Sequence, residues 1–368
     1  MTEWQHRFYY DIPFFALLHL TQCLVIGFRT PTFILCGVQR ILITGGAGFI
    51  GSHLAETLVA AGCEVFVIDD LSTGARANLT SLDGHPRFHF TEGNILDAAA
   101  LEPLVARVDF VYHLAAAVGV ELVVHRPVHT LQDNIAGTEN VLAAAARCGV
   151  GMLLASTSEV YGKSGKASFS EEDDLLIGPP TFSRWGYACS KLLDEFLAMA
   201  YWREKNIPVF IVRLFNTVGP RQTGRYGMVL PRFVEQARRG DPIVIHGDGQ
   251  QRRCFCHVSD VVRALAELPQ HEEASGQVFN VGSTEEVTIE ELARLVNAAA
   301  GGRLELKFVP YEVAYAKGFQ DMRRRVPDTG KIRRFIGWEP TLSLTEIVRS
   351  MVGRRRGNKT VAFGKRVR

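Results

Sequence analysis

The stretch Arg40-Ile-Leu-Ile-Thr-Gly-Gly-Ala-Gly-Phe-Ile-Gly51 joins a short apolar run to a glycine-rich turn, and a helical pattern over residues 51–62 follows. Because Gly45, Gly48 and Gly51 lack a Cβ, they permit a tight turn and let backbone N–H groups approach a pyrophosphate. The next apolar run, 64–68, ends at Asp69, whose carboxylate can accept hydrogen bonds from an adenosine ribose diol. A turn cap is the alternative role for Asp69. The pattern predicts a dinucleotide site that prefers NAD, because the carboxylate would repel the 2′-phosphate of NADP.

Short apolar runs alternate with helical patterns along the chain beyond this turn. The runs cover 40–44, 64–68, 88–90, 110–114, 152–155 and 209–214, and helical patterns cover 134–147 and 187–205, among others. Such alternation predicts an α/β fold with a Rossmann-type, doubly wound parallel sheet. From residue 219 the elements are shorter, which indicates a smaller C-terminal α+β lobe that contacts substrate. The chain is expected to return to the sheet near 278–281.

Four regions are predicted from these patterns: an extension over 1–38, an NAD-binding domain over 39–218, a lobe over 219–345 and a basic tail over 346–368. Residues 12–28 are apolar but only 17 long, short of the roughly 20 residues of a spanning helix. We therefore interpret residues 1–38 as an extension from an upstream start, with a membrane anchor as the alternative.

After the third apolar run, Asn94 and Ile95 could flank the adenine of the dinucleotide, or could be ordinary turn residues.

Composition excludes several classes of protein. The 368 residues carry 41 basic and 39 acidic side chains, a net charge of +2, which argues against nucleic acid as a partner. The seven cysteines are scattered, which is typical of reduced thiols and favours a cytoplasmic protein, membrane-anchored only if the N-terminal segment is an anchor. His113, His246 and His257 show no paired ligand spacing, so no metal site is predicted.

Tyr187 and Lys191 are four residues apart in a helical pattern, so they share one face of the helix. A lysine cation near a tyrosine lowers the pKa of the phenol, and the phenolate can then remove a proton from a sugar hydroxyl. The segment from Ser156 to Gly162 ends the fifth run, at the carboxyl edge of the sheet where ligands bind in this architecture. Thr157 there could relay the proton between Tyr187 and the substrate.

From residue 39 to residue 338 the chain resembles the extended short-chain dehydrogenase/reductase family, in particular its nucleotide-sugar-modifying enzymes. The matching motifs are TGGAGFIG, which includes Phe49 and Ile50; HLAA, which includes Leu114, Ala115 and Ala116; STSEVYG; the Tyr187/Lys191 pair; and RLFN followed by GPR. The resemblance implies a tightly held NAD, contacted by these residues, that oxidises the sugar at C4.

Within that family the chain is most similar to UDP-glucuronate decarboxylases. They share the segment from Ser158 to Gly162, an Arg-Trp before the tyrosine (Arg184) and an arginine before Pro-Asp (Arg325). Oxidation at C4 makes the C6 carboxylate a β-keto acid, so Arg184 and Arg325 are expected to hold the carboxylate and Glu159 to manage protons at C5. The alternatives are a surface salt bridge for Arg184, a solvated arginine run for Arg325 and loop orientation for Glu159.

Other activities stay open at this point. A UDP-glucose or UDP-hexuronate 4-epimerase needs only a loose pocket and would tolerate the arginines. A 4,6-dehydratase is disfavoured because Ser158 stands where dehydratases carry an aspartic acid. A non-catalytic NAD-binding scaffold would be expected to lack Thr157, Tyr187 or Lys191.

The resemblance also implies roles in holding the nucleotide and in assembly. Asn216 would contact the pyrophosphate of a UDP-sugar, and Arg253 would bind the nucleotide phosphates, with Arg252 able to do the same. Members of the family usually pair through two long helices, so the helices over 134–147 and 187–205 are the candidate faces of a homodimer.

Overall fold

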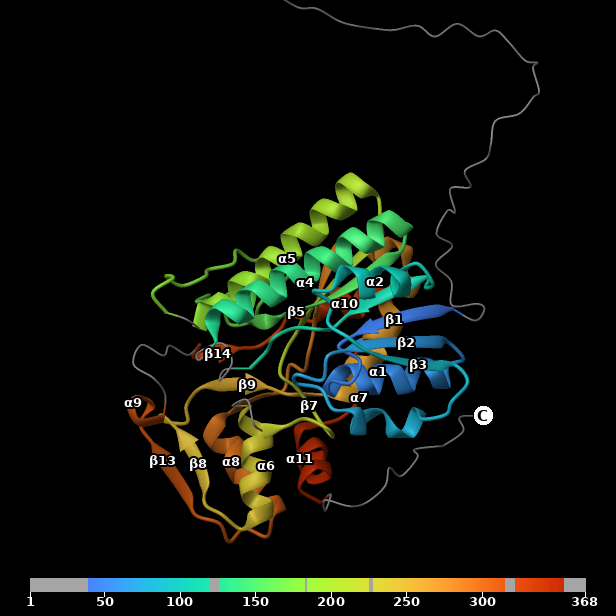
Figure 1. Ribbon diagram of the computed structural model, residues 1–368. Coiled ribbons are helices and arrows are strands. Elements are labelled where there is room, and N and C mark those ends of the chain that lie inside the picture. The colour runs from blue at the N-terminus through green and yellow to red at the C-terminus, as the bar shows by residue number, and fades with distance from the viewer. Residues whose placement is uncertain (1–38, 120–125, 183, 225–227, 315–321, 354–368) are drawn as a thin grey trace, which may run out of the picture. The chain divides into compact units, whose positions relative to one another are not determined.

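The computed structural model describes residues 39–119, 126–182, 184–224, 228–314 and 322–353. Seven parallel strands form the main sheet in the order β11-β6-β5-β4-β1-β2-β3 (Figure 1). The strands are β1 (Arg40–Thr44), β2 (Glu64–Asp69), β3 (Phe88–Glu92), β4 (Phe110–His113), β5 (Gly151–Thr157), β6 (Val209–Leu214) and β11 (Gln277–Val281). The doubly wound parallel sheet predicted from the sequence is confirmed, and its order reverses between β1 and β4, where dinucleotides bind in this fold.

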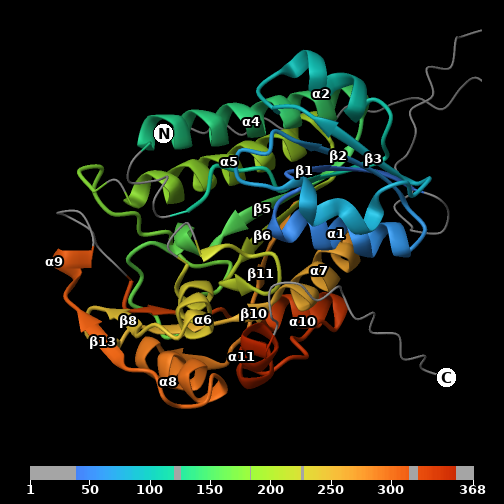
Figure 2. The ribbon, with the colours of Figure 1, turned by 60° about the horizontal axis from the view of Figure 1, so that its bottom comes forward.

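Alternating side chains of the strands pack against two helical layers. Ile41 and Ile43 of β1 face one layer and Leu42 faces the other. The first layer holds α1 (Phe49–Ala60), α7 (Val258–Glu267) and α10 (Gly330–Ile336). The second holds α2 (Ala98–Val105), α4 (Pro127–Cys148) and α5 (Arg184–Lys205), with α4 and α5 side by side in both views (Figures 1 and 2). This arrangement buries both faces of the sheet, as a fully parallel sheet requires.

Helix α4 begins at Pro127, seven residues before the predicted start at Asn134. Its first turns are polar and therefore lack the apolar periodicity that marked the rest. Proline at the first turn of a helix is the signal that was available, because its missing N–H is unpaired there anyway. The helix ends at Gly149, which adopts the left-handed conformation with φ 65°.

The lobe is built from short strands, the first of which begins at Thr217, and from four helices among the described residues. Helices α7 and α10 also belong to this part of the chain but pack on the main sheet. Strand β8 (Ile243–His246) pairs with β13 (Leu306–Val309), β9 (Arg252–Cys254) lies between β12 (Glu286–Thr288) and β14 (Arg324–Arg325), and β7 (Thr217–Val218) pairs with β10 (Cys256–His257). The helices are α6 (Val229–Arg239), α8 (Ile289–Ala299), α9 (Tyr311–Ala314) and α11 (Leu344–Gly353). Helices α6, α8 and α11 share one apolar core with β8 (Figure 2).

Strand β11 returns the chain from this lobe to the edge of the main sheet, where it pairs parallel with β6. The domain boundaries stay a prediction. No helix among the described residues is long and apolar enough to cross a membrane. The apolar segment over 12–28 and the basic tail lie outside the described residues, except that α11 covers residues 346–353.

Candidate active site

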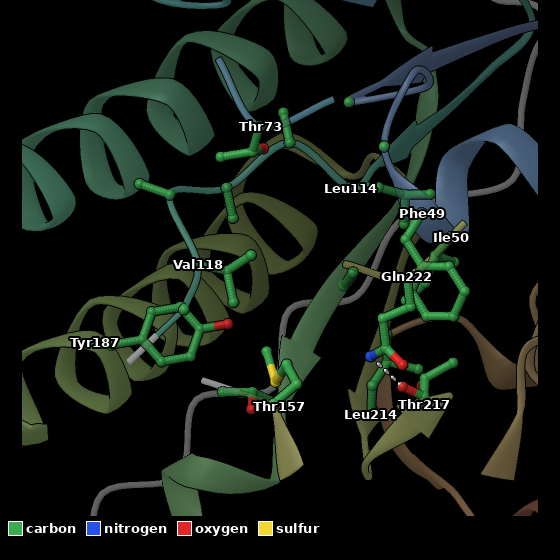
Figure 3. A pocket seen from close by; sticks show the side chains of 18 of the residues that line it. Phe49, Ile50, Thr73, Leu114, Val118, Thr157, Tyr187, Leu214, Thr217 and Gln222 are labelled. Atoms are coloured by element: carbon green, nitrogen blue, oxygen red, sulfur yellow. Dashed lines mark hydrogen bonds between the residues drawn. The ribbon is translucent and has the colours of Figure 1, made fainter. Parts of the chain in front are cut away.

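A cavity of about 650 Å³ lies at the carboxyl ends of β1, β4, β5 and β6 and extends to side chains of the lobe. Among the predicted site residues whose side chains the structure describes, all except Lys191 line it. Figure 3 shows that the phenol ring of Tyr187 extends from α5 into this cavity, toward Thr157 and Val118. The strand ends and helix starts that the sequence placed at one edge of the sheet therefore meet in one site.

The glycine-rich turn after β1 is closely packed against the turn after β4. Gly45 has φ 71°, and a Cβ on it would lie 2.7 Å from the backbone nitrogen of Ala115. A Cβ on Gly51 would lie 2.4 Å from the carbonyl oxygen of Gly45. Glycine is required at both positions for steric reasons, and the backbone stays open toward the cavity.

Asp69 at the end of β2 caps this turn and also lines the cavity. Its Oδ2 accepts a hydrogen bond from the N–H of Ala47 at 2.9 Å, and its Oδ1 accepts one from the N–H of Leu71 at 2.8 Å. Burial raises the pKa of the carboxyl. A carboxylate has about four acceptor positions, so the capping role leaves room for the ribose hydroxyls predicted to bind there.

Asn94 and Ile95 follow β3 at the same end of the cavity. The side chain of Asn94 is tied into its own turn, because Nδ2 donates to Asp70 at 2.9 Å and Oδ1 accepts from the N–H of Leu96 at 2.8 Å. The alternative of turn packing therefore applies to Asn94, while both residues still border the space expected for the adenine.

Tyr187 and Thr157 both line the cavity, and the Thr157 hydroxyl lies near enough to the phenol to lower its pKa. Lys191 lies one turn further along α5 and is buried, with 2% of its side chain exposed. Its Nζ donates to Oδ2 of Asp194 at 2.9 Å.

The pKa of Tyr187 differs from the sequence-based expectation. Burial raises it, and the carboxylates of Glu159 and Asp194 raise it further, while the nearby Thr157 hydroxyl and the charge of Arg325 lower it. Burial outweighs any lowering by a lysine because a phenolate loses much hydration in a closed site. Asp194, which the sequence reasoning missed, also offsets the charge of Lys191.

Glu159, which follows β5 of the main sheet, and Arg325, from β14 of the lobe, form an ion pair in the cavity. Arg325 belongs to β14, and a second bond joins its Nη2 to Oδ1 of Asn216 at 2.5 Å. Its side chain is only 12% exposed, so this member of the arginine run is not a solvated surface residue. Asn216 is engaged at both ends, since its Nδ2 donates to the carbonyl of Cys254 at 2.8 Å.

Alternation along β9 separates the two arginines that the sequence could not distinguish. Arg253 is buried and lines the cavity. Arg252 points the other way, is half exposed and pairs with Glu286 at 3.1 Å. Arg184 begins α5, and its side chain lies outside the described part of the structure.

The lobe contributes cavity residues that sequence reasoning missed. Arg232 of α6 donates to the ring of His246 at 3.0 Å, and burial and this cation lower the pKa of His246 to about 4. Tyr311 of α9 covers Gly247, where a Cβ would lie 2.3 Å from its ring. The sequence did offer one signal for this part of the cavity, which is a glycine shortly before the predicted phosphate-binding arginine. Gly247 adopts φ 76°, a conformation that favours glycine. No cluster of three metal-ligating side chains occurs among the described residues.

The strand order, the glycine turn and the Thr157–Tyr187 pair together define a short-chain dehydrogenase/reductase of the extended, nucleotide-sugar-modifying type, as the sequence predicted. The chain belongs to the family described as GDP-mannose 4,6 dehydratase, whose model matches residues 42–351.

Individual relatives carry other activities in their names. A UDP-N-acetyl-alpha-D-glucosaminuronate decarboxylase of Bacillus cytotoxicus is 40% identical over 306 residues, covering 83% of this chain and 94% of the relative. UDP-glucuronic acid decarboxylase 1 of Danio rerio is 36% identical over 84% of this chain and 70% of the relative. The structure of a UDP-glucuronic acid 4-epimerase variant of Bacillus cereus, with NAD and a fluorinated UDP-glucuronic acid, has a TM-score of 0.77 at 28% identity and covers 85% of this chain and 98% of that one.

Proposed function

We propose that this protein is an NAD-dependent UDP-hexuronate decarboxylase that acts on UDP-glucuronate. The observation that carries the proposal is the Glu159–Arg325 pair, which lies in the same cavity as Thr157 and Tyr187. The names of the decarboxylase relatives support it. A serine at 158 also supports decarboxylation over dehydration, because a hydroxyl is a poor general acid for expelling the C6 hydroxyl.

The cavity fits a bound NAD. The turn from Gly45 to Gly51 leaves its backbone open to a pyrophosphate, and Asp69 stands where an adenosine ribose would bind. Bound there, NAD would supply hydride-transfer chemistry at the sugar C4. Tyr187 removes the proton of the C4 hydroxyl, either directly or through Thr157, which lines the same cavity.

Arg325 holds the C6 carboxylate of the substrate in this mechanism. Its Nη1 and Nη2 bind Glu159 and Asn216, while its Nε is buried and has no hydrogen-bond partner among the described residues. Guanidinium–carboxylate pairing fixes the plane of the carboxylate. Once C4 is a ketone, the C5–C6 bond breaks, CO₂ leaves and the electron pair passes into an enolate over C4 and C5. C5 then takes up a proton from water, which the Glu159 carboxylate is positioned to orient.

The nucleotide half of the substrate is proposed to lie against the lobe. Arg253 binds the phosphates, and Arg232, His246 and Tyr311 border the end of the cavity where a uridine would fit. Asn216 orients Arg325 in this structure, and its contact with the pyrophosphate stays a prediction.

We also propose a homodimer that forms through α4 and α5, in a reducing, cytoplasmic compartment. Leu193 and Phe196 on α5 and Val128 on α4 are large apolar side chains that are 47%, 67% and 65% exposed. Leu193 and Phe196 are three residues apart and share a face of the helix. The free thiols support the compartment.

The test is mass spectrometry of the products after incubation of the purified protein with NAD and, separately, UDP-glucuronate, its 2-acetamido analogue and UDP-glucose. Loss of CO₂ from UDP-glucuronate supports the proposal. An unchanged mass with a new chromatographic peak would instead establish a 4-epimerase, and loss of water from UDP-glucose would establish a dehydratase. Loss of CO₂ from the 2-acetamido analogue alone would correct the substrate but keep the reaction.

A further inference from the structure

Lys191 and Asp194 form a buried ion pair on α5, directly behind the proposed base. Their side chains are 2% and 0% exposed, and only Oδ2 of Asp194 contacts the ammonium. The other oxygen, Oδ1, is buried and makes no hydrogen bond among the described residues. The Thr138 hydroxyl on α4 lies near this carboxyl and lowers its pKa, against the rise that burial causes.

A line of buried polar side chains continues from Thr138 to the glycine-rich turn. Nε2 of His113 contacts Oγ1 of Thr138 at 3.1 Å, and its Nδ1 contacts Oγ1 of Thr44 at 2.8 Å. Thr44 in turn accepts the N–H of Ala115 at 3.3 Å. Burial lowers the pKa of His113 to about 3, so the ring is neutral and has one donor and one acceptor nitrogen.

The ionised carboxyl gives this line one direction. A carboxylate only accepts, so a Thr138 hydroxyl that donates to Asp194 must itself accept from Nε2–H of His113. Nδ1 of His113 then accepts from the hydroxyl of Thr44, which agrees with the Ala115 N–H that Thr44 already accepts. Each donor has one acceptor in this order, and the line ends on a negative charge.

Other charged groups also surround Tyr187 and Lys191. Glu159 from the turn after β5 and Arg325 from β14 act on Tyr187, and His113 of β4 senses the charge of Lys191. Glu195 of α5, which pairs with Arg213 of β6, raises the pKa of Asp194. The His129–Asp133 pair lies on the α4 wall of the cavity. Most of these acidic groups are paired with a cation or an imidazole outside the Tyr187–Lys191 face. Asp194 is the carboxylate that is paired with Lys191 itself.

We propose that Asp194 is a positioning residue that holds the Lys191 ammonium, offsets its charge and thereby sets the pH range in which Tyr187 acts as the base. This rests on the proposed role of Tyr187. The Lys191 ammonium and the Thr138 hydroxyl both lower the pKa of Asp194 against the rise that burial causes, so they favour the ionised carboxyl. Because a neutral side chain at 194 leaves the charge of Lys191 uncompensated, it favours the tyrosinate.

The experiment compares Asp194→Asn with the wild-type holoenzyme and with Glu204→Gln, which removes a carboxylate from an exposed position of the same helix. The first readout is the pH dependence of NADH formation in a single turnover. The second is the tyrosinate absorbance of the NAD-bound protein, from which the signal of Tyr187→Phe is subtracted. We expect Asp194→Asn to move both transitions down by about one pH unit, and Glu204→Gln to leave them in place.

Two further variants keep the test decisive. Asp194→Ser also removes the charge and replaces Asp194→Asn if that protein does not fold, while Asp194→Glu keeps the charge and is expected to restore the wild-type profile. Unchanged transitions in a folded neutral variant overturn the proposal. The tyrosinate readout needs no turnover, so a shift there in a protein that releases no CO₂ would support the role of Asp194 and contradict the proposed reaction.

Discussion

Tyr187 is the residue on which the proposed chemistry depends most. Tyr187→Phe removes the proton acceptor but keeps the ring that fills the cavity wall, so kcat is expected to fall by roughly 10²–10⁴-fold with little change in NAD affinity. Steady-state kinetics and a fluorescence titration with NAD measure the two quantities. Tyr201→Phe, on the same helix and half-buried, serves as the control. Near-normal turnover by Tyr187→Phe would remove this residue from the mechanism.

Arg325 has a matched control one residue away. Arg324 is 42% exposed and pairs with Glu286 at 2.7 Å, whereas Arg325 faces the cavity. Arg325→Ala is expected to lower kcat/KM for the uronate at least 100-fold, because it removes the cation for the carboxylate, a loss of about 3 kcal/mol or more. Arg324→Ala is expected to stay within about twofold. Equal losses in both variants would place the effect in folding and not in substrate binding.

For Arg325→Ala, the direction of a change in pH dependence can also be predicted. Arg325 lowers the pKa of Tyr187 and Glu159 raises it. Removal of the guanidinium therefore raises the pKa of Tyr187, and the acid limb of the kcat profile should move to higher pH. A shift toward lower pH in Arg325→Ala would contradict this electrostatic account.

At the residue scale, spacing made part of the site predictable. The helical spacing of four residues identified Tyr187 and Lys191, and the end of a strand identified Thr157. Asp69 was identified because it ends the next strand after the glycine-rich turn. Asp194 could not be recognised in the same way. An acidic residue three positions after a lysine is usually a surface pair, and only the packing of α4 over α5 buries it.

At the scale of elements, a buried network joins α5 to β5 and β6. Arg213 of β6 donates to Glu195 of α5 at 2.8 Å and to the hydroxyl of Tyr161 at 3.0 Å, and Ser156 of β5 donates to Glu195 at 2.5 Å. Both members of the ion pair are 5% exposed. The network therefore fixes the position of the helix that carries Tyr187 relative to the strand that ends at Thr157.

Removal of one partner from this network is expected to be costly. Arg213→Met leaves the Glu195 carboxylate buried without its cation, so the free energy of unfolding should fall by about 3–5 kcal/mol. Arg40→Met breaks the pair with Asp109, whose members are 42% and 35% exposed, and should cost about 1 kcal/mol or less. Urea unfolding followed by circular dichroism measures both. Similar losses in the two variants would show that burial of the Arg213 pair has no special weight.

The strands of the sheet were largely predictable, and so was α8 of the lobe, whereas the shortest strands of the lobe were not. Strands β1 and β6 have the predicted bounds because buried parallel strands are continuous apolar runs. Strands β7, β10 and β14 have two residues each, too few for any periodicity. Their positions depend on partners far along the chain, so the contact of Arg325 with Glu159 was foreseeable only by resemblance.

At the scale of the whole molecule, the proposed homodimer predicts a specific sensitivity. Phe196→Glu puts a charge on the exposed face of α5 and is expected to yield monomers. Phe308→Glu changes an equally large side chain, 47% exposed on β13, and should leave the assembly intact. Light scattering after size-exclusion chromatography measures the mass. A wild-type protein that runs as a monomer, or a Phe196→Glu protein that stays a dimer, would contradict the proposed interface.

The whole account depends on loss of C6 from the sugar after oxidation at C4. The most direct measurement is a ¹³C NMR time course with UDP-glucuronate labelled at C6, NAD and the full-length protein, with Tyr187→Phe as the inactive reference. We predict that the carboxylate signal disappears while the summed signals of labelled CO₂ and bicarbonate grow by the amount of carboxylate that is lost. A signal that stays in a sugar carboxylate while a second hexuronate accumulates would contradict the decarboxylase and establish epimerisation.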